Sequence, residues 1–236
     1  MALYRYVKDK RKKLKKIVSR ISVFLIISGL SLLTWIIYPI ASFELEYAPK
    51  FGTIIKPVPN EPIKQVIRRD VNEVLAATIT DYTKASVWFP KATNIKPTTS
   101  FVSYFLSIPK LKIERATVLI GTEDLSKSLI QYTGTLPGEL GNPVIFGHST
   151  LPFLYNPKNY TTIFTKLPTL DKGDEILVSI DNVTFKYNII DMRITSPDDL
   201  SVLEQNYDDS YITLITCVPP GTYFKRLIIK ARLEHI

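Results

Sequence analysis

The sequence predicts a mostly β body, preceded by one membrane-spanning helix and a partly helical stalk. Residues 21–43 contain no charged side chain, which is typical of a membrane span. Residues 44–103 are interrupted by six prolines and contain room for one helix. From residue 104 onward short apolar runs recur between turn signals, a pattern that indicates a single β-barrel or sandwich with short helices.

Charge is concentrated at the amino terminus. Residues 1–20 carry nine Lys or Arg and one Asp, a net charge of +8 that equals the formal charge of the whole chain. Residues 21–236 are therefore neutral overall, with 21 basic and 21 acidic residues. The high isoelectric point does not indicate a nucleic-acid surface on the folded part, and we expect no nucleic-acid partner.

The apolar segment 21–43 predicts a single-pass signal anchor in the cell membrane. About 20 apolar residues cross a bilayer as a helix. Trp35 and Tyr38 lie toward its far end, where amphipathic rings favour the headgroup region. The positive-inside rule places the basic tail, residues 1–20, in the cytoplasm and everything from Glu44 onward outside. A cleavable signal peptide, processed near Ala41-Ser42, is the alternative.

Residues 44–103 are expected to form an extracellular stalk or linker. A helix is predicted near residues 60–79, with Asn60 as its N-cap and Pro62 in its first turn. Its apolar stripe either docks on the following domain or binds a separate partner.

The domain at 104–236 contains seven expected strands. Asp181-Asn182 separates two of them as a tight turn, and residues 171–174 form a surface turn. Short helices are expected at residues 123–130 and 197–204. The expected strands are residues 105–108, 118–120, 144–146, 175–180, 183–190, 211–217 and 227–233.

The residue pattern of the last expected strand predicts on which face of the sheet Arg226 lies. Leu227, Ile229 and Ala231 alternate with the residues between them, and the first set suits the interior of a barrel. Because side chains alternate along a strand, Arg226 must point to the other face, where a groove can use it.

The chemically reactive residues all lie at strand ends. Cys217 is the one cysteine in the chain, so it forms no internal disulfide, and two prolines follow it directly. We expect its sulfur at the rim of the sheet, where it can be reached. His148 ends another apolar run, and a Cys, a His and an Arg together can make a thiol acyl-transfer site. Taken singly, Cys217 can be a buried packing residue, His148 a structural residue and Arg226 a surface ion-pair partner.

Two segments resemble the sortases, the cell-surface transpeptidases of the Gram-positive type. The sequence Thr-Leu-Ile-Thr-Cys at residues 213–217 meets the Thr-Leu-x-Thr-Cys pattern in full, and Arg-Leu-Ile follows at 226–228. Residues 136–148, from Leu-Pro-Gly-Glu-Leu to Phe-Gly-His, are similar to the segment that leads to the sortase catalytic histidine. The resemblance covers residues 104–236 and implies a closed sortase-type β-barrel of about eight strands.

The resemblance also implies roles and substrates. Cys217 would be the nucleophile, His148 the general acid and base, and Arg226 the oxyanion and substrate-backbone ligand, while Thr216 would help to position substrate. Secreted proteins with a C-terminal Leu-Pro-x-Thr-Gly-like sorting signal would be cleaved between Thr and Gly. The acyl group would then pass to an amine of a peptidoglycan precursor or a pilin lysine. A surface endopeptidase without transfer and a non-catalytic peptide-binding barrel stay open as alternatives.

The class implied is housekeeping, or class D- or E-like, rather than the pilin-polymerising class C. Val87-Trp88-Phe89-Pro90 is a loose match to the Asp-Pro-aromatic lid motif of some members, so a lid within residues 44–103 stays open. No cofactor is expected. No metal site is expected either, because the paired acidic residues of the later loops suit solvated surfaces: Asp198, Asp199, Asp208 and Asp209.

Overall fold

A computed structural model of the chain describes residues 10–53, 81–92 and 103–234. The chain divides into two compact units, Met1–Ser42 and Phe43–Ile236. The helix expected near residues 60–79 lies outside the described residues. The expected boundary between stalk and domain at residue 103 stays a prediction.

The first unit contains one long helix, α1 (Lys10–Ser42). Its apolar part is long enough to cross a membrane, and it is the one described helix with that property. Pro39 lies in its last turn. The expectation of a single N-terminal helix of spanning length is therefore confirmed, whereas its orientation stays a prediction.

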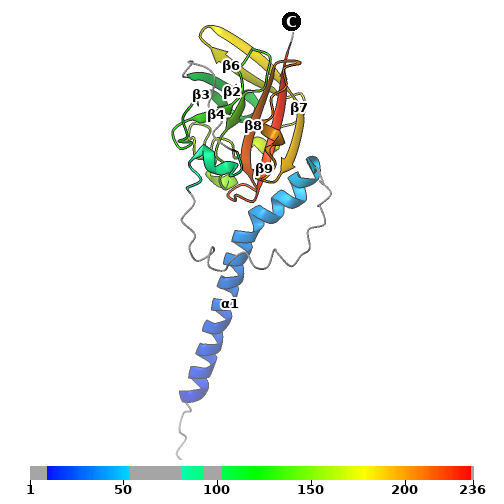
Figure 1. The fold of residues 1–236 in the computed structure, drawn as a ribbon. Helices are drawn as coiled ribbons and strands as arrows, with labels where there is room; N and C mark the ends of the chain where they lie inside the picture. The colour runs from blue at the N-terminus through cyan, green and yellow to red at the C-terminus, as the bar shows by residue number, and fades with distance from the viewer. Residues whose placement is uncertain (1–9, 54–80, 93–102, 235–236) are drawn as a thin grey trace, which may run out of the picture. The chain divides into compact units, whose positions relative to one another are not determined.

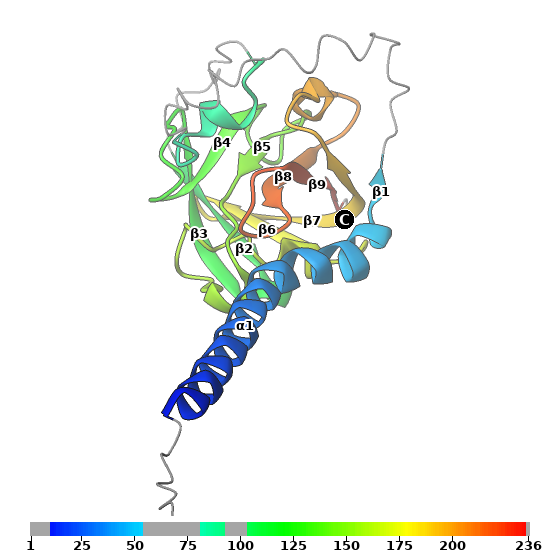
Figure 2. The ribbon, with the colours of Figure 1, turned by 90° about the horizontal axis from the view of Figure 1, so that it is seen from below.

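The second unit is a closed barrel of eight strands (Figure 1; seen from below in Figure 2). The order around the barrel is β7-β6-β2-β3-β4-β5-β8-β9, and β9 pairs with β7 to close it. The pairs β3–β4 and β5–β8 are parallel. A two-residue strand, β1 (Gly52–Thr53), runs parallel to β7 outside the closed ring. The barrel strands are β2 (Ser103–Ile108), β3 (Ile113–Ile120), β4 (Leu129–Thr133), β5 (Val144–Phe146), β6 (Glu175–Ile180), β7 (Val183–Thr195), β8 (Tyr211–Val218) and β9 (Lys225–Leu233).

All seven expected strands are present, and the mostly β prediction is confirmed. The helix expected at residues 123–130 is wrong. Asp124 accepts hydrogen bonds from the backbone and the hydroxyl of Ser126, which makes a local turn there. Strand β4 follows, with Leu129 and Ile130 both fully buried. Since both faces of β4 are covered, its apolar residues do not alternate with polar ones and the strand signal is weak. The helix expected at 197–204 is a single 3-10 turn, η8 (Leu200–Leu203).

Two apolar clusters pack on opposite sides of the sheet. The inner cluster fills the barrel with residues such as Ile145, Leu214 and Leu227. The outer cluster lies against the outside of β4, β5, β8 and β9. It joins Ala85, Trp88, Phe89, Leu125, Ile130, Val144, Phe146, Val202, Leu203, Ile215, Cys217 and Ile228. A barrel with one apolar outer face needs a cover, and residues 81–92, here called the cover segment, supply part of it together with η8.

The first residues of the second unit belong to the barrel. Phe43 and Phe51 are buried in the inner cluster, at either end of the short turns η1 (Phe43–Tyr47) and η2 (Ala48–Lys50). Burial of two aromatic rings stabilises this attachment by roughly 2–3 kcal/mol each. Residues 43–51 are thus packed on the barrel and do not form a free linker.

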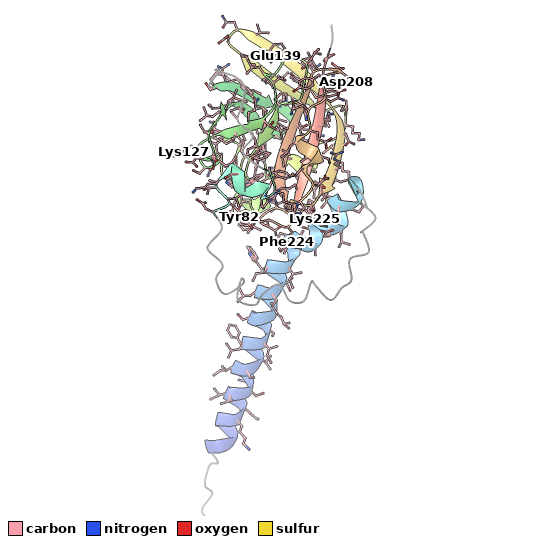
Figure 3. All side chains as sticks on the ribbon, viewed as in Figure 1. Tyr82, Lys127, Glu139, Asp208, Phe224 and Lys225 are labelled. Carbon is pink, nitrogen blue, oxygen red and sulfur yellow. The ribbon has the colours of Figure 1, made fainter. Side chains whose placement is uncertain are left out.

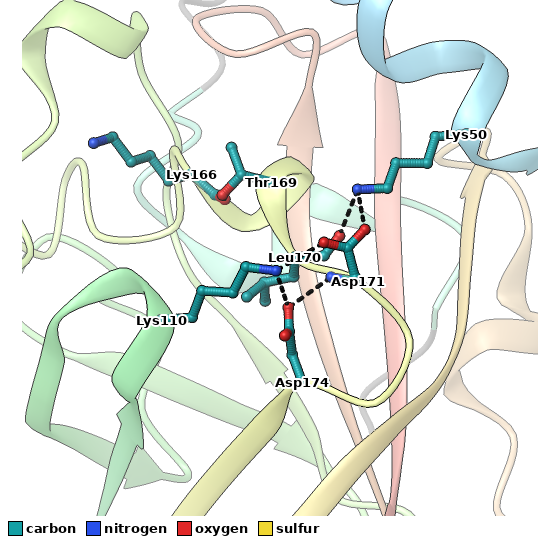
Figure 4. A network of polar contacts seen from close by, with 7 residues as sticks. All are labelled: Lys50, Lys110, Lys166, Thr169, Leu170, Asp171 and Asp174. Atoms are coloured by element: carbon teal, nitrogen blue, oxygen red, sulfur yellow. Dashed lines mark hydrogen bonds and ion pairs between the residues drawn. The ribbon is translucent and has the colours of Figure 1, made fainter.

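An ion network fastens the same stretch from outside (Figure 4). The Lys50 ammonium donates to the Leu170 carbonyl at 3.0 Å and pairs with Asp171 at 2.5 Å. Lys110 joins Asp171 to Asp174, with both distances at 2.7 Å. Hydrogen bonds from Lys110 and Lys50 lower the pKa of Asp171 to about 2.

Candidate active site

The structure brings Cys217, His148 and Arg226 to adjacent positions on three neighbouring segments. Cys217 on β8 is paired directly with Arg226 on β9. Strands β5 and β8 are parallel with Phe146 beside Ile215, so two further residues bring His148 level with Cys217. Cys217 belongs to the outer cluster, and the barrel residues that alternate with it face inward. The three predicted site residues therefore meet on the outer face of the barrel.

The peptide that carries His148 is held closely to the sheet. Gly147 permits this, because a Cβ there would lie 2.4 Å from the Phe164 ring and 2.6 Å from Leu129. The amide of Gly147 donates to the Ile215 carbonyl at 3.2 Å, and the amide of Phe164 donates to the His148 carbonyl at 2.9 Å. The first bond continues the alignment of β5 with β8 beyond the last residue of β5, and the second fastens His148 to the segment around Phe164.

Thr216 contributes to the same alignment. It is fully buried, and its hydroxyl donates to the Gly147 carbonyl at 2.7 Å. The sequence suggested a role for Thr216 in positioning substrate. In this arrangement its hydroxyl is bonded to the backbone beside His148, and a role in positioning substrate stays a prediction.

Cys217 is buried, not exposed at a rim as expected from the two prolines. Its exposed fraction is 2%. Burial raises the pKa of the thiol to about 11, and the nearby Arg226 guanidinium acts in the opposite direction. Burial also lowers the pKa of His148, against the smaller effects of the Asp124 and Asp81 carboxylates. Thiol and imidazole are accordingly both neutral at pH 7 in this closed arrangement.

Arg226 points out of the barrel, as its strand position predicts, but it is not open to a groove. Its exposed fraction is 1%. Its Nη2 donates to the Trp88 carbonyl at 3.0 Å and its Nη1 to the Tyr223 carbonyl at 3.0 Å. Its Nε has no hydrogen-bond partner among the described residues. The expectation of an accessible guanidinium is thus corrected: the cover segment occupies the space above it.

Trp88 is the central residue of this cover, and sequence reasoning did not include it among the site residues. Its side chain is fully buried. Its ring lies 5.6 Å from the His148 ring, edge to face, and 5.4 Å from the Arg226 guanidinium. It also stacks on Phe146 at 5.3 Å. The available signal was Val87-Trp88-Phe89-Pro90, the loose match to a lid motif.

Tyr82 fastens the cover segment to the loop between β8 and β9. Its ring stacks on Tyr223 with the centroids 3.9 Å apart, and its carbonyl accepts from the Trp88 indole at 2.9 Å. Figure 3 shows Tyr82, Phe224 and Lys225 at one end of the barrel, with Glu139 and Asp208 at the other. The cover is therefore bonded both to the reactive face and to the adjoining loop.

Replacing Trp88 by alanine should expose Cys217 to a thiol alkylator. Removal of the indole admits water, so the thiol pKa falls from about 11 toward its ordinary value. At pH 8 we expect the alkylation rate to rise roughly 100-fold because the thiolate fraction grows by that factor. The rate of iodoacetamide labelling as a function of pH, followed by mass spectrometry, measures both effects.

Phe185→Ala is the matched control. Phe185 is a partly buried aromatic residue on β7 that packs against the inner cluster and Gly138. An equal increase of the Cys217 alkylation rate in the two variants would mean that the whole barrel is loosened, and it would contradict a specific covering role of Trp88.

The sequence matches the family described as Sortase domain over residues 106–234, more than half of the chain. It is 30% identical over 142 residues to Sortase D of Bacillus subtilis (strain 168), covering 58% of this chain and 66% of that protein. It is 27% identical over 132 residues to Sortase A of Bacillus anthracis, covering 54% of this chain and 58% of that protein. The chain thus spans less than two thirds of the length of either relative. Among solved structures, Sortase A from Corynebacterium diphtheriae superposes with a TM-score of 0.50 at 28% identity, covering 58% of this chain and 62% of that one.

Proposed function

The chain belongs to the sortase family, and from this premise we propose that it is a membrane-anchored cysteine transpeptidase of the cell surface. The observation that carries the proposal is the direct cross-strand pair of Cys217 and Arg226, with His148 aligned beside the cysteine on the parallel strand. The similarity to Sortase D agrees with a class D-like member. The proposed orientation keeps the basic tail in the cytoplasm and the barrel outside.

The proposed reaction proceeds through a thioester on Cys217. The thiolate attacks the carbonyl carbon of the scissile peptide bond, and the carbon–nitrogen bond breaks as protonated His148 gives its proton to the leaving amine. His148 then takes a proton from the acceptor amine, whose nitrogen attacks the thioester carbonyl. The carbon–sulfur bond breaks, a new peptide bond forms and the thiolate is restored.

Arg226 is proposed to stabilise the oxyanion of both tetrahedral intermediates. Its two Nη groups now donate to the backbone carbonyls of Trp88 and Tyr223. A carbonyl oxygen at the position of Trp88 O is what a bound peptide would present to the same nitrogen. A fixed guanidinium in a site closed to water is well suited to developing negative charge.

The reaction requires the cover segment to leave the reactive face. In the closed arrangement the thiol is neutral and enclosed, with a pKa of about 11. Departure of Trp88 and Phe89 uncovers Phe146, Ile215 and Ile228, an apolar strip beside the cysteine. Such a strip suits the Leu and Pro of a Leu-Pro-x-Thr-Gly-like signal, cleaved between Thr and Gly. The proposed acceptor is an amine of a peptidoglycan precursor or a pilin lysine.

Incubation of the detergent-solubilised full chain with a Leu-Pro-x-Thr-Gly peptide and an added amine tests the proposal. We expect a product in which the amine is joined to the Thr carbonyl, identified by mass spectrometry. The Trp88→Ala variant is assayed in parallel, so that a closed cover cannot hide the activity.

If both proteins yield only hydrolysed peptide, the chain is a surface endopeptidase that does not transfer the acyl group to the amine. If the peptide binds but is not cleaved, the chain is a non-catalytic peptide-binding barrel. Either result would contradict the proposed transpeptidase.

A further inference from the structure

Two side-chain hydroxyl groups form hydrogen bonds between the segment that carries His148 and the segment that carries Cys217. Strand β5 has only three residues and ends at Phe146, two residues before His148. On one side of His148, Thr216 Oγ1 donates to the Gly147 carbonyl at 2.7 Å. On the other side, Ser149 Oγ donates to the Cys217 carbonyl at 2.6 Å. Each segment thus sends one hydroxyl to a carbonyl of the other.

From this reciprocal pair of bonds we propose that Ser149 is a positioning residue for the Cys217–His148 couple. It touches no reacting atom and acts through the cysteine carbonyl. The inference rests on the proposed function, for which thiol and imidazole must exchange a proton. Such groups need placement within a few tenths of an ångström, and a displacement of about 1 Å can cost 100-fold in rate.

The position of Ser149 explains why a hydroxyl is needed there. The residues after β5 turn away from the sheet, and the amide of Thr150 donates to the Thr165 hydroxyl at 2.9 Å. Ser149 is half-buried and directly follows the histidine. A bond from this residue to Cys217 therefore prevents the two backbones from separating where the regular pairing of β5 ends.

Several charged and titratable groups lie around Cys217 and His148. Each of them affects how the titration of the thiol and the imidazole changes in a Ser149 variant. Burial raises the pKa of the thiol, and Arg226 on β9 opposes this effect. Burial lowers the pKa of His148, and Asp124, before β4, and Asp81, on the cover segment, oppose this effect. Tyr223, in the loop between β8 and β9, interacts with the cysteine electrostatically. Ser149 carries no charge, so its removal changes the pH dependence only by moving the thiol and the imidazole relative to each other and to these charged groups.

Ser149→Ala in the full chain tests the proposal. We expect kcat for peptide transfer to fall roughly tenfold with KM unchanged, and Ser149→Thr to restore it. The pH profile of Cys217 alkylation should shift, because the sulfur moves relative to the Arg226 guanidinium, which acts to lower the thiol pKa. Nitrogen NMR of His148, labelled selectively, should show an altered imidazole titration.

Thr169→Ala is the control, since its hydroxyl also donates to a backbone carbonyl, at 2.8 Å, but within its own turn and not to the cysteine segment. The proposal is overturned if Ser149→Ala leaves kcat and the alkylation profile unchanged. It is equally overturned if both variants lose activity only in proportion to a lower melting temperature.

The alkylation and NMR measurements need no substrate. If they change as expected while the native protein fails to transfer peptide, the positioning role stands and the proposed function fails.

Discussion

Cys217→Ala is expected to reduce both cleavage and amine transfer at least 10³-fold, to the background rate. The alanine has no nucleophile, so neither the thioester nor any later step can form. The outer cluster loses one buried sulfur, which should lower the free energy of unfolding by only about 1 kcal/mol. Peptide turnover and denaturant unfolding of the full chain, measured on the same preparation, separate the two effects.

Ala85→Gly supplies a control of similar size in the same cluster. Ala85 is a fully buried residue of the cover segment and carries no reactive group. The glycine should destabilise the protein comparably without abolishing turnover. Peptide transfer by Cys217→Ala at the native rate would show that the thiol is not the nucleophile.

Arg226→Ala should have the second largest effect, a loss of about 10²–10³ in kcat/KM. The guanidinium is the charge beside the thiol, and it is the proposed oxyanion ligand. The protein should also be less stable by about 2–4 kcal/mol, because the carbonyls of Trp88 and Tyr223 lose their donors and a cavity replaces the side chain. Steady-state kinetics and thermal unfolding measure both losses.

Two further variants separate the effect of the positive charge of Arg226 from the effect of its planar guanidinium geometry. Arg226→Lys keeps a cation but loses the planar fork, so the thiol pKa should stay near the native value while kcat/KM remains low. Arg232→Ala removes an arginine at an exposed position of the same strand, and its kinetics should be native. Native kinetics for Arg226→Ala itself would remove Arg226 from the mechanism.

Most strands of the barrel could be predicted from the sequence, because the alternation of apolar and polar residues that indicates a strand involves only neighbouring residues. Alternation of Leu227, Ile229 and Ala231 predicts the inward face of β9, and the outward direction of Arg226 follows from it. The cysteine and histidine motifs likewise stand at strand ends in the structure. Strand β4 was missed for the opposite reason, since Leu129 and Ile130 are buried on both faces and leave no period of two.

The closed state of the site depends on contacts that no local pattern contains. The bond from Arg226 to the Trp88 carbonyl joins residues 138 positions apart. Nothing in the sequence around Cys217 indicates that an indole will cover it and raise the pKa of its thiol. The positions of the three site residues were therefore predictable from short motifs, whereas their accessibility depended on a distant segment.

The place of β9 in the chain has a consequence for biosynthesis. It follows every other strand of the barrel in sequence, and it pairs with both β8 and β7. A ribosome delivers residues in order, so the guanidinium of Arg226 reaches the sulfur only after all seven other strands have left the exit tunnel. A chain interrupted before β9 carries the thiol without its arginine, and its barrel lacks the strand that closes the ring.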